Sequence, residues 1–313
     1  MEKLDVLDYV LLIINFLLGS FLILVLLVCL TACGTSTPSP QPSTPIDQTT
    51  LRQLRDDIQA KSPTCQYTST FRGVSKGNCL SEGTGTGDGD VMLFAGLLCL
   101  SGSYIGCDTV AYSIDDNGKP WRSPGRVGID KRSESFSRDM FLGLMAYLVR
   151  TKDTATALKF QGFLERNDNR LCLDSCDMTG TTWGLMGEVW QYIELPLTLR
   201  MKTGMVTDDF AQWVASGVNE HGYTQHLIAA TIYIRQKMNR NSTGLVDAAI
   251  TLVEKNPGNT FYALLAGFEF AHMTCEVPAT STRMDWLWEK YPEHHANAVG
   301  WDCVLVYNML IKE

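Results

Sequence analysis

The chain has 313 residues, a formal charge of −8 and 45% hydrophobic residues. A mildly acidic chain lacks the basic surface that nucleic acid requires, so we expect no nucleic-acid partner. The length beyond the first 50 residues is enough for one large domain with a generous core, and no second linker divides it.

An uncharged apolar run over residues 9–33 ends in Leu-Thr-Ala-Cys33. The run is about as long as a helix that spans a bilayer. Its last four residues resemble the lipobox of bacterial lipoproteins, which implies cleavage before Cys33 and lipidation of that cysteine. A retained membrane helix is the alternative, because residues 1–8 are acidic where an export signal is normally positive.

The chain is therefore predicted to have three parts. Residues 1–33 form the signal or anchor, residues 34–50 a disordered polar linker rich in proline, and residues 51–313 the folded domain. Either form of the N-terminus tethers the chain to a membrane. We expect the domain to lie on the periplasmic or cell-surface side.

The cysteines agree with an oxidising compartment. Eight of the ten remain after the N-terminal run, an even number that suits a disulfide framework. Neighbours along the chain are predicted to pair: Cys65 with Cys79, Cys99 with Cys107, Cys172 with Cys176, and Cys275 with Cys303. The spacing of Cys172 and Cys176 also suits zinc, but no second close pair accompanies them. We expect no metal and no cofactor.

The folded region is predicted to be almost wholly helical, because apolar residues recur at helical spacing between Gly, Pro, Asn and Asp. Strand-like alternation is nearly absent, and residues 109–114 fit either a strand or a helix. The predicted helices cover residues 92–100, 136–149, 155–164, 186–199, 226–234, 245–253 and 261–270.

A weak repeat of about 40 residues underlies these helices, which is the length of one helical hairpin with its loops. Polar and aromatic residues introduce an apolar helix at residues 87–90, 133–139, 180–183, 221–226, 256–260 and 298–302. A second, more polar helix fits between successive starts, as at residues 153–166. Six such hairpins can close into a ring whose inner helices all start at one end.

This layout resembles the six-hairpin (α/α)6 toroid of glycoside hydrolases and polysaccharide lyases, over about residues 81–313. The fold prediction is therefore an all-α (α/α)6 toroid stapled by disulfides. An open stack of helical hairpins in a binding protein is the alternative.

The resemblance implies an oligo- or polysaccharide substrate bound where the inner helices start. Glycoside hydrolysis uses two carboxyl groups, and we predict Asp90 and Asp139 as the pair with Asp88 in reserve. For Asp88 and Asp90 the structural alternative is a helix cap, and for Asp139 it is an ion pair with Arg138. In a lyase of the same fold, Tyr223 or His226 would abstract the proton.

Aromatic faces and arginines at these helix starts are predicted to bind the sugar. Trp121 is predicted to be an exposed stacking platform, because Ser, Pro, Gly and Lys surround it. A non-catalytic surface lipoprotein that binds a glycan or a protein is the other functional hypothesis. The predicted substrate-binding residues are Trp121, Arg122, Arg138, Trp183, Tyr223, His226, Tyr262 and Trp301.

Overall fold

The computed structural model describes residues 47–75, 91–128, 136–171, 180–196, 198, 210–217, 222–240, 243–256, 259–268 and 301–311. The chain divides into two compact units, Met1–Pro45 and Ile46–Glu313, and all described residues belong to the second. The predicted signal, Cys33 and most of the predicted linker lie outside the described residues.

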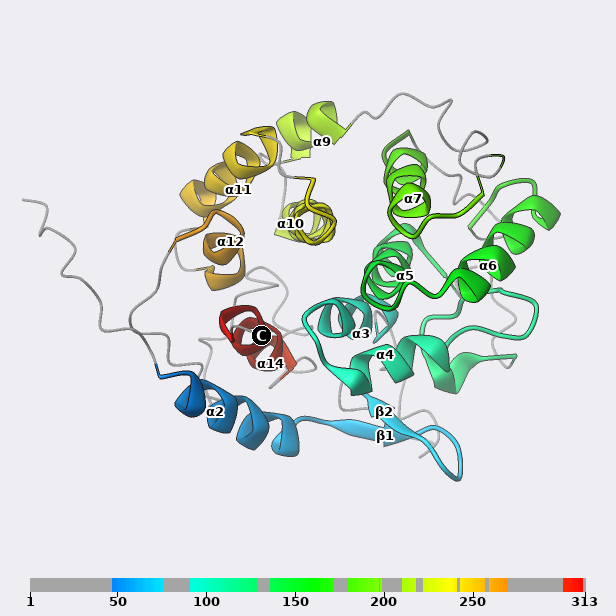
Figure 1. Ribbon diagram of the computed structural model, residues 1–313, viewed down its shortest axis with the longest axis horizontal. Coiled ribbons are helices and arrows are strands. Elements are labelled where there is room, and N and C mark those ends of the chain that lie inside the picture. Colours follow the sequence, from blue (N-terminus) through cyan, green and yellow to red (C-terminus); the bar gives the residue numbers. More distant parts are fainter. Residues whose placement is uncertain are drawn as a thin grey trace, which may run out of the picture. The chain divides into compact units, whose positions relative to one another are not determined.

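The second unit is mostly helical, as predicted (Figure 1). Each of the seven apolar runs contributes to a helix, and the first helix begins at Gln48, three residues before the expected start of the domain. The helices are α2 (Gln48–Lys61), α3 (Val91–Leu100), α4 (Tyr104–Ala111), α5 (Arg138–Thr151), α6 (Thr154–Arg166), α7 (Gly180–Tyr192), α9 (Phe210–Gly217), α10 (Gly222–Lys237), α11 (Thr243–Lys255), α12 (Thr260–Leu265) and α14 (Trp301–Leu310).

The ends of two helices differ from the prediction. The helix predicted over residues 186–199 is α7, which starts at Gly180 and ends at Tyr192 because Glu194 takes a left-handed conformation with φ 63°. The helix predicted to reach residue 270 ends at Leu265, close to Gly267 with φ 79°. Helical periodicity locates a helix, but single residues with positive φ decide where it stops.

A small antiparallel hairpin, β1 (Thr64–Gln66) with β2 (Arg72–Val74), was not predicted. Three-residue strands are too short to show an alternating pattern in the sequence. The ambiguous stretch at residues 109–114 is the end of α4, followed by an isolated bridge between Ile114 and Pro120.

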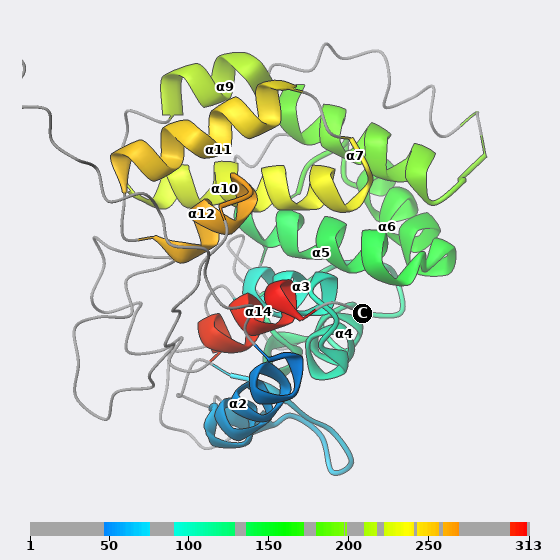
Figure 2. The same cartoon turned by 60° about the vertical axis from the view of Figure 1, so that its left-hand side comes forward.

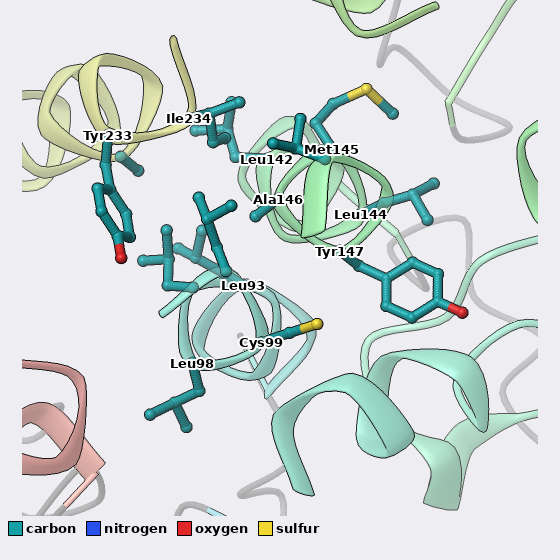
Figure 3. Close-up of a cluster of buried hydrophobic side chains, with 14 of the residues drawn as sticks. Leu93, Leu98, Cys99, Leu142, Leu144, Met145, Ala146, Tyr147, Tyr233 and Ile234 are labelled. Atoms are coloured by element: carbon teal, nitrogen blue, oxygen red, sulfur yellow. The ribbon is translucent and has the colours of Figure 1, made fainter. Parts of the chain in front are cut away.

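The centre of the core is the crossing of α3 with α5. All ten residues of α3 are buried. A Cβ on Gly96 would overlap the carbonyl oxygen of Gly143, and one on Gly143 would overlap that of Met92. Two glycines therefore let the helix backbones touch. Figure 3 shows Leu93 of α3 facing Ala146 of α5, with Tyr233 of α10 beside them.

Helices α3 and α10 each pack against several other helices. Helix α3 packs against α4, α5 and α14, while α10 packs against α5, α9, α11 and α12 (Figures 1 and 2). Arg235 Nε lies 2.9 Å from Glu188 Oε2, and Arg240 hydrogen-bonds to Gln191.

The predicted disulfide between Cys99 and Cys107 is confirmed, and it ties α3 to α4. Cys65 and Cys303 are disulfide-bonded as well. Their predicted partners lie outside the described residues, as do Cys172 and Cys176, so those pairings stay predictions.

Within the described ranges, no helix is long and apolar enough to cross a membrane. The predicted anchor at residues 9–33 lies outside those ranges.

Candidate functional site at the helix starts

Asp139 occupies the first turn of α5 and is 7% exposed. The Ser137 hydroxyl, which precedes the helix, donates a hydrogen bond to Asp139 Oδ1. The N-terminal end of a helix favours a negative charge, so α5 accommodates this buried carboxylate. Ser137, not Asp139, occupies the N-cap position.

The structural alternative predicted for Asp139 was an ion pair with Arg138. Arg138 is exposed, and its guanidinium makes no ion pair with the neighbouring carboxylate, both residues being among those described. Asp139 is thus buried without the partner that the sequence offered. Buried ionisable groups that lack an obvious structural pairing are candidates for function.

The titratable neighbour of Asp139 is His226, in the second turn of α10. His226 is fully buried, and this burial lowers the pKa of His226 to about 3. The charge of Asp139, on the neighbouring helix α5, acts in the opposite direction and raises this pKa. Burial outweighs the charge, so His226 is neutral at pH 7.

Uncharged amides surround the start of α10. Asn256 Nδ2 donates to Gln225 Oε1 at 2.8 Å. Asn259 Oδ1 caps α12 by accepting from the Tyr262 backbone N–H at 3.1 Å. The His226 ring lies 6.4 Å from that of Phe261 in the first turn of α12. The starts of α5, α10 and α12 therefore meet at one place.

The start of α3 is held by a different segment. The Met92 backbone N–H donates to the carbonyl oxygen of Arg122 at 2.9 Å, so residues 121–122 lie against the beginning of α3. Asp88 and Asp90, the predicted partners of Asp139, lie outside the described residues. They precede α3 directly in sequence.

The exposed position expected for Trp121 is wrong. Its side chain is 6% exposed, its indole N–H donates to Asp115 Oδ2 at 3.2 Å, and Lys119 Nζ lies 3.8 Å above its ring. The polar residues that suggested a surface platform instead form a turn that covers the ring. Asp115 Oδ1 accepts from the Lys119 backbone N–H at 3.0 Å, and Gly118 provides the positive φ of that turn.

Other predicted stacking residues also belong to the core. Tyr262 and Trp301 are each 2% exposed, and the Trp301 indole N–H donates to the Pro63 carbonyl at 2.8 Å. Trp183 is partly buried against the core. Tyr223 belongs to the first turn of α10, but its side chain lies outside the described set.

Sequence reasoning missed Ser137 and Asn256 as neighbours of the site. Both are common surface residue types. Ser137 reaches Asp139 locally, from two residues earlier in the chain, whereas the packing of separate helices brings Asn256 beside Gln225. It also missed Tyr112, which is 48% exposed. No group of three His, Cys, Asp or Glu side chains that could hold a metal ion occurs among the described residues.

Comparison with known protein families, with characterised proteins and with solved structures found no match for this chain. Function is therefore inferred from the residues of the site. Those residues combine one buried carboxylate, one neutral buried histidine and several amide and hydroxyl groups.

Proposed function

We propose that this chain is a membrane-tethered, extracytoplasmic protein that hydrolyses a glycan, with its helical hairpins closed into an (α/α)6 toroid. The order of helix contacts supports the ring. Contacts link α3 to α5, α5 to α7, α10 to α12, α12 to α14, and α14 back to α3. The Arg235–Glu188 ion pair links α7 to α10. The disulfide supports an oxidising compartment.

One observation carries the proposed chemistry: Asp139 and His226 lie near the starts of two helices that pack together, α5 and α10, and both side chains are buried. Burying an ionisable pair costs free energy, and such pairs concentrate where chemistry takes place. The proposal rests on two side chains, the Asp139 carboxyl and the His226 imidazole, and on their position near the starts of α5 and α10.

Hydrolysis requires an acid that protonates the leaving oxygen and a second carboxylate that activates water or attacks the sugar. Asp139 supplies one carboxyl, and Asp90 supplies the other from the residue before α3, with Asp88 in reserve. Neutral His226 donates or accepts a hydrogen bond without adding charge. Gln225 and Arg122 contribute polar groups suited to sugar hydroxyls.

A polysaccharide lyase on the same fold is the second candidate. A histidine that removes the proton next to a uronate must be neutral, as His226 is at pH 7, but its lowered pKa makes it a weak base, so Tyr223 is the other candidate for that role. Arg122 would then neutralise the uronate. The third candidate is a non-catalytic lipoprotein that binds a glycan or a protein in the same place.

The test is cleavage of bacterial surface polysaccharides and peptidoglycan by the full chain. New reducing ends report any cleavage, and 4,5-unsaturated uronate absorbance reports lyase cleavage alone. Asp139→Asn is expected to reduce turnover by about 10²- to 10⁴-fold, because it removes an acid or base from the transition state. The matched control is Asp247→Asn, an exposed position on α11, which is expected to cleave normally.

Loss of reducing ends in the Asp139 variant alone, without uronate absorbance, supports the hydrolase. Uronate absorbance assigns the lyase. Binding without cleavage by the wild-type chain contradicts both enzymes and leaves the binding protein. Equal unfolding transitions of the two variants show that any loss is chemical and not structural.

A further inference from the structure

Tyr112, which follows the last residue of α4, is a partly exposed aromatic side chain whose ring stacks on another aromatic ring. It is 48% exposed, and its ring lies 4.0 Å from that of Phe71 with an interplanar angle of 8°. Phe71 is only 7% exposed and is itself stacked with Tyr67, at 6.1 Å and 22°. Phe71 covers one face of Tyr112, so the exposed surface is the opposite face and the ring edge.

The support beneath Tyr112 is fixed by hydrogen bonds. The Tyr67 hydroxyl donates to the Val74 carbonyl at 2.8 Å. The Val74 backbone N–H donates to Thr109 Oγ1 at 2.9 Å, and that hydroxyl donates to the Ile105 carbonyl at 2.7 Å. Thr109 thus fastens the β1–β2 hairpin to α4. A ring held in one orientation loses little freedom when a ligand stacks on it, which favours binding.

Tyr112 lies at the end of α4 that faces the start of α3. A tight turn at Gly102, with φ 111°, sends α4 back along α3, and Gly106 packs on Ala95. Beyond Tyr112, the Trp121 backbone N–H donates to the Ser113 carbonyl at 2.8 Å. The next residue, Arg122, holds the start of α3. Two backbone hydrogen bonds therefore connect the segment that follows Tyr112 to the start of α3.

Asp108 adds a polar group to the same surface. It is exposed and lies four residues before Tyr112 on α4, so both side chains share one face of the helix. A carboxylate is an acceptor for sugar hydroxyls, and it repels a uronate. An aromatic face beside such an acceptor suits an uncharged pyranose, whose apolar C–H face packs on the ring.

We propose that Tyr112, stacked on Phe71, is an outer subsite that binds an uncharged sugar ring of the same glycan chain. This inference rests on the proposed function. The subsite replaces Trp121 as the exposed stacking residue near the start of α3. A chain long enough to reach from Asp139 to Tyr112 is held at both places, whereas a short oligosaccharide is held only at the first.

The test measures binding of the full chain to named oligosaccharides by isothermal titration calorimetry. The probes are hexasaccharides of glucose, N-acetylglucosamine and galacturonate, with the matching disaccharides. Tyr112→Ala is expected to weaken binding of an uncharged hexasaccharide by about 3- to 10-fold and to leave the disaccharide unchanged. Tyr112→Phe keeps the ring and is expected to bind as the wild type does.

The matched control is Tyr104→Ala, which removes an 82% exposed tyrosine at the opposite end of the same helix. It is expected to bind every probe normally. Equal weakening in the Tyr104 and Tyr112 variants overturns the subsite, as does unchanged hexasaccharide binding by Tyr112→Ala. Stronger binding of galacturonate than of the uncharged hexasaccharides overturns its preference for uncharged sugars.

The outcomes also separate the subsite from the proposed reaction. Cleavage that depends on Asp139, with no effect of Tyr112→Ala, overturns the subsite alone. Weaker hexasaccharide binding by Tyr112→Ala, together with normal cleavage by Asp139→Asn, overturns the proposed chemistry and supports the subsite. A wild-type chain that binds none of the hexasaccharides overturns the subsite, whatever the cleavage assay shows, and leaves an apolar side chain of a protein partner as the occupant of Tyr112.

Discussion

His226 links the candidate site to the stability of the domain. Its pKa is about 3 in the folded state, against 6.5 for an ordinary histidine, because burial disfavours the charged form. Between these two pH values the His226 imidazole is protonated in the unfolded chain and neutral in the folded chain. The stabilising contribution of a neutral His226 is therefore complete above pH 6.5 and is lost as the pH falls towards 3.

We expect this loss in urea unfolding of the wild-type chain compared with His226→Gln. Below pH 6.5 the free energy of unfolding of the wild type should fall faster than that of the variant, by at most about 1.4 kcal/mol per pH unit. Measurements at about pH 7, 6 and 5 are sufficient. Carboxyl groups that titrate in both proteins cancel in the comparison. If the free energy of unfolding fell equally with pH in the wild type and in His226→Gln, the lowered pKa of His226 would be contradicted.

The sequence predicted which residues stand at the helix starts, because polar residues before an apolar run identify a helix N-terminus. It did not predict their surroundings. The structural alternative expected for Asp139 was an ion pair with Arg138, and the structure does not form it. The burial of Trp121 depends on Asp115 and Lys119 folding back over it, a local turn that the polar composition alone did not reveal.

The backbones of α3 and α5 touch at Gly96 and Gly143, so this crossing has no room for a larger side chain. Gly143→Ala places a Cβ against the Met92 carbonyl, and backbone atoms cannot move aside as a flexible side chain does. We expect a loss of about 1 to 3 kcal/mol in the free energy of unfolding, measured by urea denaturation. The crossing of α3 with α5 would have to open for the variant to fold.

Gly162→Ala on α6 is the matched control. Its Cβ would meet only the end of the Arg166 side chain, at 3.2 Å, which can move. Alanine is the better helix former, so this variant is expected to gain up to about 1 kcal/mol. A loss of the same size in both variants would contradict the special role of the α3–α5 crossing.

At the scale of the whole molecule, α14 connects segments that are far apart in the sequence. It packs against α2, α3 and α12. The Asn308 amide donates to Ser101 Oγ at 3.0 Å, and Trp301 donates to the Pro63 carbonyl. The sequence predicted a helix start here, but nothing in its periodicity indicated that the first and last described helices would be neighbours.

Trp301→Ala is therefore expected to destabilise the whole domain, not only its last helix. Removing a fully buried tryptophan costs about 3 to 5 kcal/mol. Calorimetry should show one unfolding transition moved to lower temperature. Trp183→Ala, which removes a partly buried tryptophan, should move it less. A separate early transition in the Trp301 variant would mean that α14 unfolds independently of the rest.

The pairing of α14 with α2 has a consequence for the order in which the domain assembles. The hydrogen bond from Gln48 to the Leu310 carbonyl and the contact of Arg55 with Asn308 join residues from opposite ends of the domain. Contacts of such large sequence separation form late and slow the folding reaction. During synthesis α2 cannot make these contacts until α14 has left the ribosome, so this part of the core is completed only after nearly the whole chain has been translated.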